Sequence, residues 1–128
     1  MIGTDGSSVS PTGILRFGKP HPRYYGTYPR VLGKYVREEG TLTLEDAIRR
    51  MTSFPAQRLG LWDRGLLKEG LWADIVCFDP TTVRDRATFE DPHQYPVGIH
   101  HVIVNGTQVI TNEQHTGECP GTFLKRLS

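Results

Sequence analysis

The chain has 128 residues, 37% hydrophobic and 23% charged, which is the composition of one modest globular domain rather than of a disordered segment. Its 15 basic and 14 acidic residues are mixed and give a formal net charge of +1, so no basic face is available for nucleic acid or a membrane surface. No apolar run approaches the roughly 20 residues of a membrane span and no secretory signal is visible, so we expect a cytoplasmic protein.

The first candidate for chemistry is Asp5, which ends a short apolar start and is followed at once by Gly6. In parallel α/β sheets and barrels, reactive groups lie just beyond the carboxyl ends of strands, so a carboxylate in this position fits a catalytic role. Asp-Gly is also a common turn pair, in which the Asp side chain bonds nearby backbone and Gly supplies positive φ. Both interpretations stay open from these residues alone.

A long loop without periodicity follows Asp5 and carries two further candidates, His21 and Arg23. Structureless loops longer than about 12 residues are usually functional or disordered, and several prolines favour an ordered, functional loop here. The planar guanidinium of Arg23 could bind a substrate carboxylate, or it could stack on a neighbouring tyrosine or pair with an acidic surface group. His21 could contact substrate or be an ordinary surface histidine.

Three helical segments are predicted next. Thr27 as N-cap, Pro29 in the first turn and apolar residues at helical spacing predict a helix that ends at Gly40. A capping box beginning at Thr43 starts a second helix, and a short helical turn over residues 56–59 follows it. The apolar faces of these helices are narrow, so they need packing partners that this chain barely supplies.

The second half of the chain has the pattern of strands. Residues 73–78 are rich in β-formers and include Cys77, which we expect to be a small buried hydrophobe. Residues 81–96 form a long polar excursion. With Cys119 far from Cys77 in sequence, a reduced protein is the simplest interpretation, although a disulfide stays open.

A β-hairpin is predicted near the end. Residues 99–104 and 107–111 flank Asn105-Gly106, a pair that provides both positive-φ positions of a type I′ turn. The tail, residues 112–128, is polar except for Phe123 and Leu124, which could form a last helical turn.

The histidine spacing gives no support for a metal site. A strand chelates metal through His-x-His and a helix through His-x-x-x-His, and neither spacing occurs. His100 and His101 are adjacent in a strand, so their rings point to opposite faces and we expect structural roles. His93 and His115 lie in polar loops and are expected to be solvated. Phosphate-binding loops and nucleophile elbows are also absent.

A series of short motifs covers nearly the whole chain: Gly3-Thr4-Asp5-Gly6, Lys19-Pro20-His21-Pro22-Arg23, Gly26-Thr27-Tyr28-Pro29-Arg30, Pro55-Ala56-Gln57-Arg58-Leu59-Gly60, Ala73-Asp74-Ile75-Val76, Asp91-Pro92-His93-Gln94-Tyr95-Pro96 and Val104-Asn105-Gly106. Together they resemble the C-terminal third of the N-acyl-D-amino-acid deacylases, in the metal-dependent amidohydrolase superfamily. The resemblance implies an α+β chain. Residues 1–60 would be the last strand (residues 1–4), active-site loop and helices of a (β/α)₈ barrel, and residues 61–128 part of a small β-sandwich and a tail.

The resemblance also implies a reaction: zinc-assisted hydrolysis of an N-acyl-D-amino acid to a carboxylate and a D-amino acid. In that scheme Asp5 carries the proton and is a possible metal contact, and Arg23 and His21 contact the substrate. The family's metal ligands have no counterpart here, so we expect no complete metal site and no activity from this chain alone. It would work with an upstream barrel segment or chain. Alternatives are a hydantoinase- or dihydroorotase-like fragment, or a non-catalytic module that joins a separate barrel.

Overall fold

The computed structural model describes residues 1–125, which form helices and one antiparallel sheet, as the α+β prediction states. The chain divides into two compact units. The loop–helix unit contains residues 2–47 and 80–98, and the sheet unit contains residue 1, residues 48–79 and residues 99–125 of the described chain. In chain order the elements are η1 (Gly13–Leu15), α1 (Arg23–Arg30), η2 (Val31–Glu38), α2 (Leu44–Met51), α3 (Ser53–Leu59), β1 (Ile75–Phe78), β2 (Ile99–Val104), β3 (Thr107–Thr111) and β4 (Gln114–His115).

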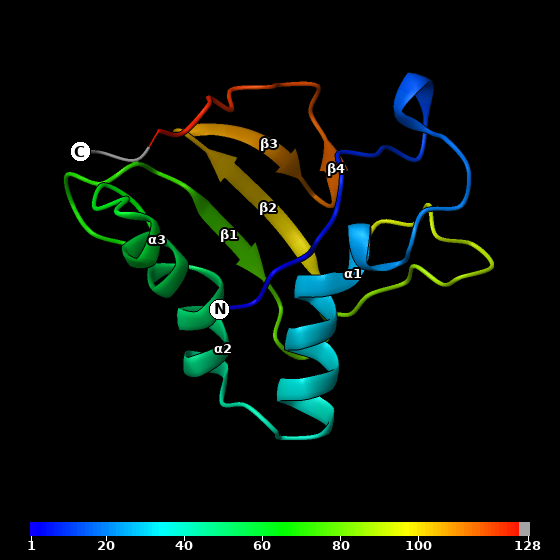
Figure 1. Cartoon of the computed structure of the whole chain (residues 1–128), viewed down its shortest axis with the longest axis horizontal. Helices are drawn as coiled ribbons and strands as arrows, with labels where there is room; N and C mark the ends of the chain where they lie inside the picture. The colour runs from blue at the N-terminus through cyan, green and yellow to red at the C-terminus, as the bar shows by residue number, and fades with distance from the viewer. Residues whose placement is uncertain (126–128) are drawn as a thin grey trace. The chain divides into compact units, whose positions relative to one another are not determined.

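The first long helix begins earlier than its sequence pattern predicts. It starts at Arg23 with Pro22 as its N-cap, and α1 continues without a break into the π-helical η2 (Figure 1). The predicted N-cap, Thr27, is an interior residue whose hydroxyl donates to the carbonyl of Arg23 at 2.8 Å. The predicted start was therefore wrong, because a proline suits the start of a helix at either position, and Pro22 rather than Pro29 stands at this one. The end was predicted within two residues, since η2 stops at Glu38.

Segment 80–98 packs along this helix within the loop–helix unit (Figure 1, yellow-green). Val83 is fully buried, and its carbonyl accepts a 2.7 Å hydrogen bond from Arg37. The backbone approaches so closely that a Cβ added at Gly33 would lie 2.8 Å from that same oxygen. Asp85 pairs with Arg30 at 2.7 Å, and this hydrogen bond raises the pKa of Arg30. Residues 81–96, predicted from their polar sequence to be a long irregular stretch, are therefore packed on the helix.

The next two helices follow their local signals. The hydroxyl of Thr43 accepts a hydrogen bond from the amide of Asp46 at 3.2 Å, which confirms the predicted cap of α2. The short helical turn predicted over residues 56–59 is longer, because α3 begins at Ser53 and takes Pro55 into its first turn. Gly60 closes it with a left-handed φ of 73°. No helix in residues 1–125 is long and apolar enough to cross a membrane.

The sheet unit contains four antiparallel strands in the order β1-β2-β3-β4 (Figure 1). The predicted hairpin is confirmed: β2 pairs with β3, and Asn105 and Gly106 have φ values of 49° and 80°. The predicted strand over residues 73–78 is shorter, because β1 begins at Ile75. The two-residue strand β4 was not predicted, since it has no alternating pattern.

Three further expectations were wrong. Cys77 is exposed rather than buried, and so is Val76, whose side chain lies on the other face of β1. His115 is exposed as expected but lies in β4 rather than in a loop. Phe123 and Leu124 belong to no helix, and the remainder of the predicted tail, residues 126–128, lies outside the described part of the chain. Residues 1–4 belong to no strand in this structure, and the barrel strand that the resemblance implies for them stays a prediction.

Candidate functional site

Asp5 is exposed and held by one cation. Its side chain is 90% exposed, and its φ of 48° lies in the left-handed region that Asp tolerates better than most residues. The guanidinium of Arg23 donates to Asp5 twice, from Nη2 to the carboxylate Oδ2 at 2.8 Å and from Nε to the backbone carbonyl at 3.2 Å. Asp5 therefore keeps a defined position while its carboxylate stays accessible to a reacting molecule.

Arg23 lies at the first residue of α1, where Pro22 ends the loop. Besides its contacts to Asp5, its guanidinium lies over the ring of Tyr24, 5.7 Å from the ring centroid. The two simpler roles left open by the sequence, stacking on a tyrosine and pairing with an acidic group, are thus both present in the structure. Whether Arg23 also binds substrate stays a prediction.

His21 lies beside Arg23 and is exposed. Its Nδ1 accepts a hydrogen bond from the Arg23 amide at 3.0 Å, so Nε2 carries the proton of the neutral ring. Its ring edge contacts Phe89, with the centroids 4.9 Å apart. Arg23 contacts both other predicted site residues, so the structure brings Asp5, His21 and Arg23 into one cluster.

His93 was predicted to be solvated, and this was wrong. Both of its ring nitrogens have partners: Nδ1 lies 2.9 Å from the hydroxyl of Tyr25, and Nε2 lies 3.1 Å from the carbonyl of Gly18. Burial raises the pKa of Tyr25 above its ordinary value of 10.0, and the nearby charge of Arg16 opposes the shift. No local spacing indicates this cluster, because Tyr25 and His93 lie 68 residues apart in sequence.

Arg16 is a second guanidinium on the loop of residues 6–22, which we call the Asp5 loop. It is exposed, and no residue in the described range 1–125 forms an ion pair with it. The sequence analysis did not select Arg16, because an arginine within a loop has no distinguishing pattern. It supplies a free positive charge on the same loop that leads from Asp5 to Arg23.

Comparison with known proteins decides the family. Residues 3–110, most of the chain, match the Amidohydrolase family. The chain belongs to the amidohydrolase family. Over all of its 128 residues it is 47% identical to D-aminoacylase of Alcaligenes xylosoxydans xylosoxydans, and it spans 25% of the length of that relative.

Solved amidohydrolases agree with this assignment. A D-aminoacylase with a binuclear metal center matches 78% of this chain and 21% of its own, with 49% identity and a TM-score of 0.76. The N-acyl-D-glutamate deacylase of Bordetella bronchiseptica, complexed with zinc and a phosphonate inhibitor, matches 71% of this chain and 19% of its own, with 54% identity and a TM-score of 0.70. The chain thus spans about a quarter or less of the relatives that it matches.

The described residues of this amidohydrolase do not fit a complete metal centre. Among residues 1–125, no three His, Cys, Asp or Glu side chains gather closely enough to hold a metal ion. Asp5 is a single carboxylate that is bonded to Arg23, and both ring nitrogens of His93 are occupied. A catalytic zinc normally has three protein ligands, and the described residues do not bring three such side chains together.

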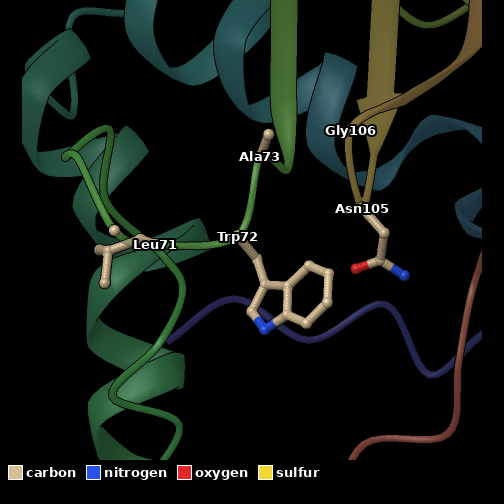
Figure 2. A pocket seen from close by; sticks show the side chains of 6 residues that line it. Leu71, Trp72, Ala73, Asn105 and Gly106 are labelled. Atoms are coloured by element: carbon tan, nitrogen blue, oxygen red, sulfur yellow. The ribbon is translucent and has the colours of Figure 1, made fainter.

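A shallow hollow of about 290 Å³ lies in the sheet unit, where the Trp72 indole and the Asn105 amide face the same space (Figure 2). The Asn105 Nδ2 donates to the carbonyl of Pro120 at 2.8 Å, which leaves its buried Oδ1 without a partner in the described chain. The hollow contains no acid or base, so it adds no residue to the cluster around Asp5. Its remaining lining residues are Gly70, Leu71, Ala73 and Gly106.

Proposed function

We propose that this chain is the C-terminal portion of a zinc-dependent N-acyl-D-amino-acid deacylase, which hydrolyses the amide bond to give a carboxylate and a D-amino acid. The observation that carries the proposal is the 47% identity to D-aminoacylase across the entire chain. Residues 1–60 would complete a barrel and residues 61–128 part of a β-sandwich. The cytoplasm is the expected compartment.

Asp5 is the proton carrier in this proposal. Its carboxylate accepts a proton from the attacking water and returns it to the nitrogen of the leaving amine, so a single group acts first as base and then as acid. Arg23 supports this role by holding Oδ2, because Oδ1 then has no partner in the described chain and is free to accept the proton. The 90% exposure of the Asp5 side chain is consistent with access by substrate.

Arg23 and His21 are the proposed substrate contacts. Arg23 donates to Asp5 through Nε and Nη2, so its remaining N–H groups could bind the carboxylate of an N-acyl-D-amino acid. His21 has its Nε2–H free to donate, because its Nδ1 already accepts from the Arg23 amide. Arg16, on the same loop as His21, has a guanidinium that forms no ion pair within the described residues and could assist them.

The zinc and most of its ligands would come from a barrel segment or chain upstream of these residues. We therefore propose that residues 1–128 are inactive alone. A non-catalytic module that associates with a separate barrel is the second candidate, and it is favoured by the missing metal cluster among residues 1–125. An adjacent reading frame that encodes the barrel with its His-x-His would support a split enzyme.

The test uses two proteins. The purified chain should contain no stoichiometric zinc and release no D-amino acid from N-acetyl-D-amino acids; zinc with turnover would contradict the proposed inactivity. The second protein is the Alcaligenes D-aminoacylase with its matching segment replaced by residues 1–128, which we call the chimera. The chimera should be active, and Asp5→Asn should abolish turnover while most zinc is retained. Full activity of that variant would remove Asp5 from the reaction.

A further inference from the structure

His93 connects the middle of the Asp5 loop to helix α1. It lies in segment 80–98 and contacts the carbonyl of Gly18 at 3.1 Å on one side and the hydroxyl of Tyr25 at 2.9 Å on the other. Gly18 belongs to the loop, and Tyr25 lies on α1 two residues after Arg23. One imidazole therefore joins three stretches of the loop–helix unit that are distant in sequence.

The chemistry of these partners selects one tautomer of the neutral ring. A carbonyl oxygen can only accept, so Nε2 of His93 must carry a proton to bond Gly18. In the neutral ring Nδ1 is then an acceptor, and the hydroxyl of Tyr25 donates to it. All three groups are satisfied at once in this tautomer, whereas the opposite tautomer places a lone pair against the carbonyl.

The loop has little else to hold its middle in place. The other hydrogen bonds of residues 6–20 in the described structure join near neighbours within the loop, or reach Thr4 just before it. Residues Gly13–Leu15 form only a single short 3₁₀ turn with no buried side chain. Since such a segment has few contacts to oppose its motion, the bond to His93 is a major restraint on it.

Segment 80–98 is rigid enough to act as the anchor. Its backbone is packed on the helix at Val83, and its ends are joined by the Arg84–Val97 bridge. Near His93, the Tyr25 ring also contacts the ring of Tyr95 edge-on, with the centroids 5.9 Å apart. His93 thus ties the Asp5 loop, which has no core of its own, to a segment that is packed in place.

We propose that His93 is a positioning residue, which holds the Asp5 loop against α1 so that Asp5 and Arg23 keep their contact. The two site residues lie at opposite ends of this loop, so motion of its middle changes their separation. The catalytic consequence rests on the proposed function. The anchoring of the loop by His93 does not rest on it, and its tests need no activity assay.

The first test determines the tautomer of the His93 ring directly. In the ¹⁵N spectrum of the labelled chain at neutral pH, His93 should show a protonated Nε2 and an unprotonated Nδ1. The Nδ1–H tautomer, or the averaged signal of an exposed ring, would overturn the proposal. Because this measurement needs no substitution, it does not depend on a variant folding.

The second test measures exposure of the loop to trypsin. Arg16–Phe17 is the bond to follow, because Lys19 precedes proline and resists cleavage. His93→Leu removes both hydrogen bonds and should speed cleavage at Arg16 by about 3- to 10-fold, since cleavage follows the open population and each bond contributes modestly. His93→Gln keeps a donor toward Gly18 and should restore most of the protection.

His100→Leu is the matched control, because His100 is an exposed histidine on β2, and its cleavage rate at Arg16 should equal that of the unmodified chain. Equal rates for His93→Leu and the unmodified chain would overturn the proposal, as would equal rates for His93→Leu and His93→Gln. The glutamine variant and the ring spectrum decide the question even if the leucine variant does not fold. An inactive chimera with a protected Arg16 would refute the proposed function and leave the anchor intact.

Discussion

Gly33→Ala should destabilise the chain, although alanine is the better helix former. A Cβ at Gly33 would lie 2.8 Å from the carbonyl oxygen of Val83 and 3.4 Å from the Cα of Arg84, both backbone atoms of the packed segment. The segment cannot retreat freely, because Val83 is fully buried and its carbonyl also accepts the hydrogen bond from Arg37. Overpacking of this kind costs about 1–3 kcal/mol, against a gain of about 1 kcal/mol in helix propensity.

The net expectation is a loss of about 0–2 kcal/mol in the free energy of unfolding, measured by urea denaturation of the 128-residue chain. Gly3→Ala is the control, because a Cβ there meets nothing within 4 Å, and its stability should change by less than about 0.5 kcal/mol. A Gly33→Ala chain more stable than the unmodified one by about 1 kcal/mol, the full gain in helix propensity, would refute the close packing of segment 80–98 on the helix.

Three further predictions concern stability and charge. Asp5→Asn should change the free energy of unfolding by only about 0–1 kcal/mol in urea, because its ion pair is largely exposed; a loss above about 2 kcal/mol would make Asp5 structural. Asp74→Ala should lower the free energy of unfolding by about 2–4 kcal/mol, because it removes the 2.7 Å partner of the Arg64 guanidinium, and the Arg64 side chain is only 13% exposed. Asp63→Ala should lower it by less than about 1 kcal/mol. Burial raises the pKa of Tyr25 in the folded chain, so the folded state holds this proton more tightly than the unfolded state, and stability should fall as pH rises above 10.0. Tyr25→Phe should remove that component from the alkaline unfolding curve, and an unchanged curve would contradict the assigned shift.

Local signals in the sequence predicted local structure well. The Asn105-Gly106 turn and the Thr43 cap depend on residues within four positions of each other, and both are present as expected. The start of the first helix depended on a choice between two prolines, which the pattern alone does not decide. Segment 80–98 packs against the helix at Gly26 and Gly33, and these contacts are not visible in local sequence.

Burial was predicted less well than backbone structure. Cys77 has the pattern of a core strand, yet β1 lies at the edge of the sheet, and strand propensity does not say which strand lies there. His93 has the pattern of a solvated loop residue, yet both its nitrogens are bonded. In each case the deciding neighbour is far away in sequence, 68 residues for the contact between His93 and Tyr25.

The candidate site shows the same limit. Asp5 could be selected from its place after a short apolar segment, and Arg23 from the prolines before it. Their mutual contact spans 18 residues and became visible only in the structure. Arg23 therefore has two possible roles, to position Asp5 and to bind substrate. Because its guanidinium already pairs with the carboxylate of Asp5, it attracts the carboxylate of a substrate less strongly.

Arg23→Lys separates these two roles in the chimera. Lysine keeps the charge but cannot hold the carboxylate and the carbonyl of Asp5 with a planar fork, as Arg23 does through Nη2 and Nε. If Arg23 chiefly positions Asp5, kcat should fall by about 10-fold or more with little change in KM, since the lost interaction acts on the proton carrier. A rise in KM with kcat unchanged would instead assign Arg23 to the substrate carboxylate. We expect the effect on kcat to dominate, because Nη2 and Nε of Arg23 hold Asp5, and a contact to substrate would use only the remaining N–H groups.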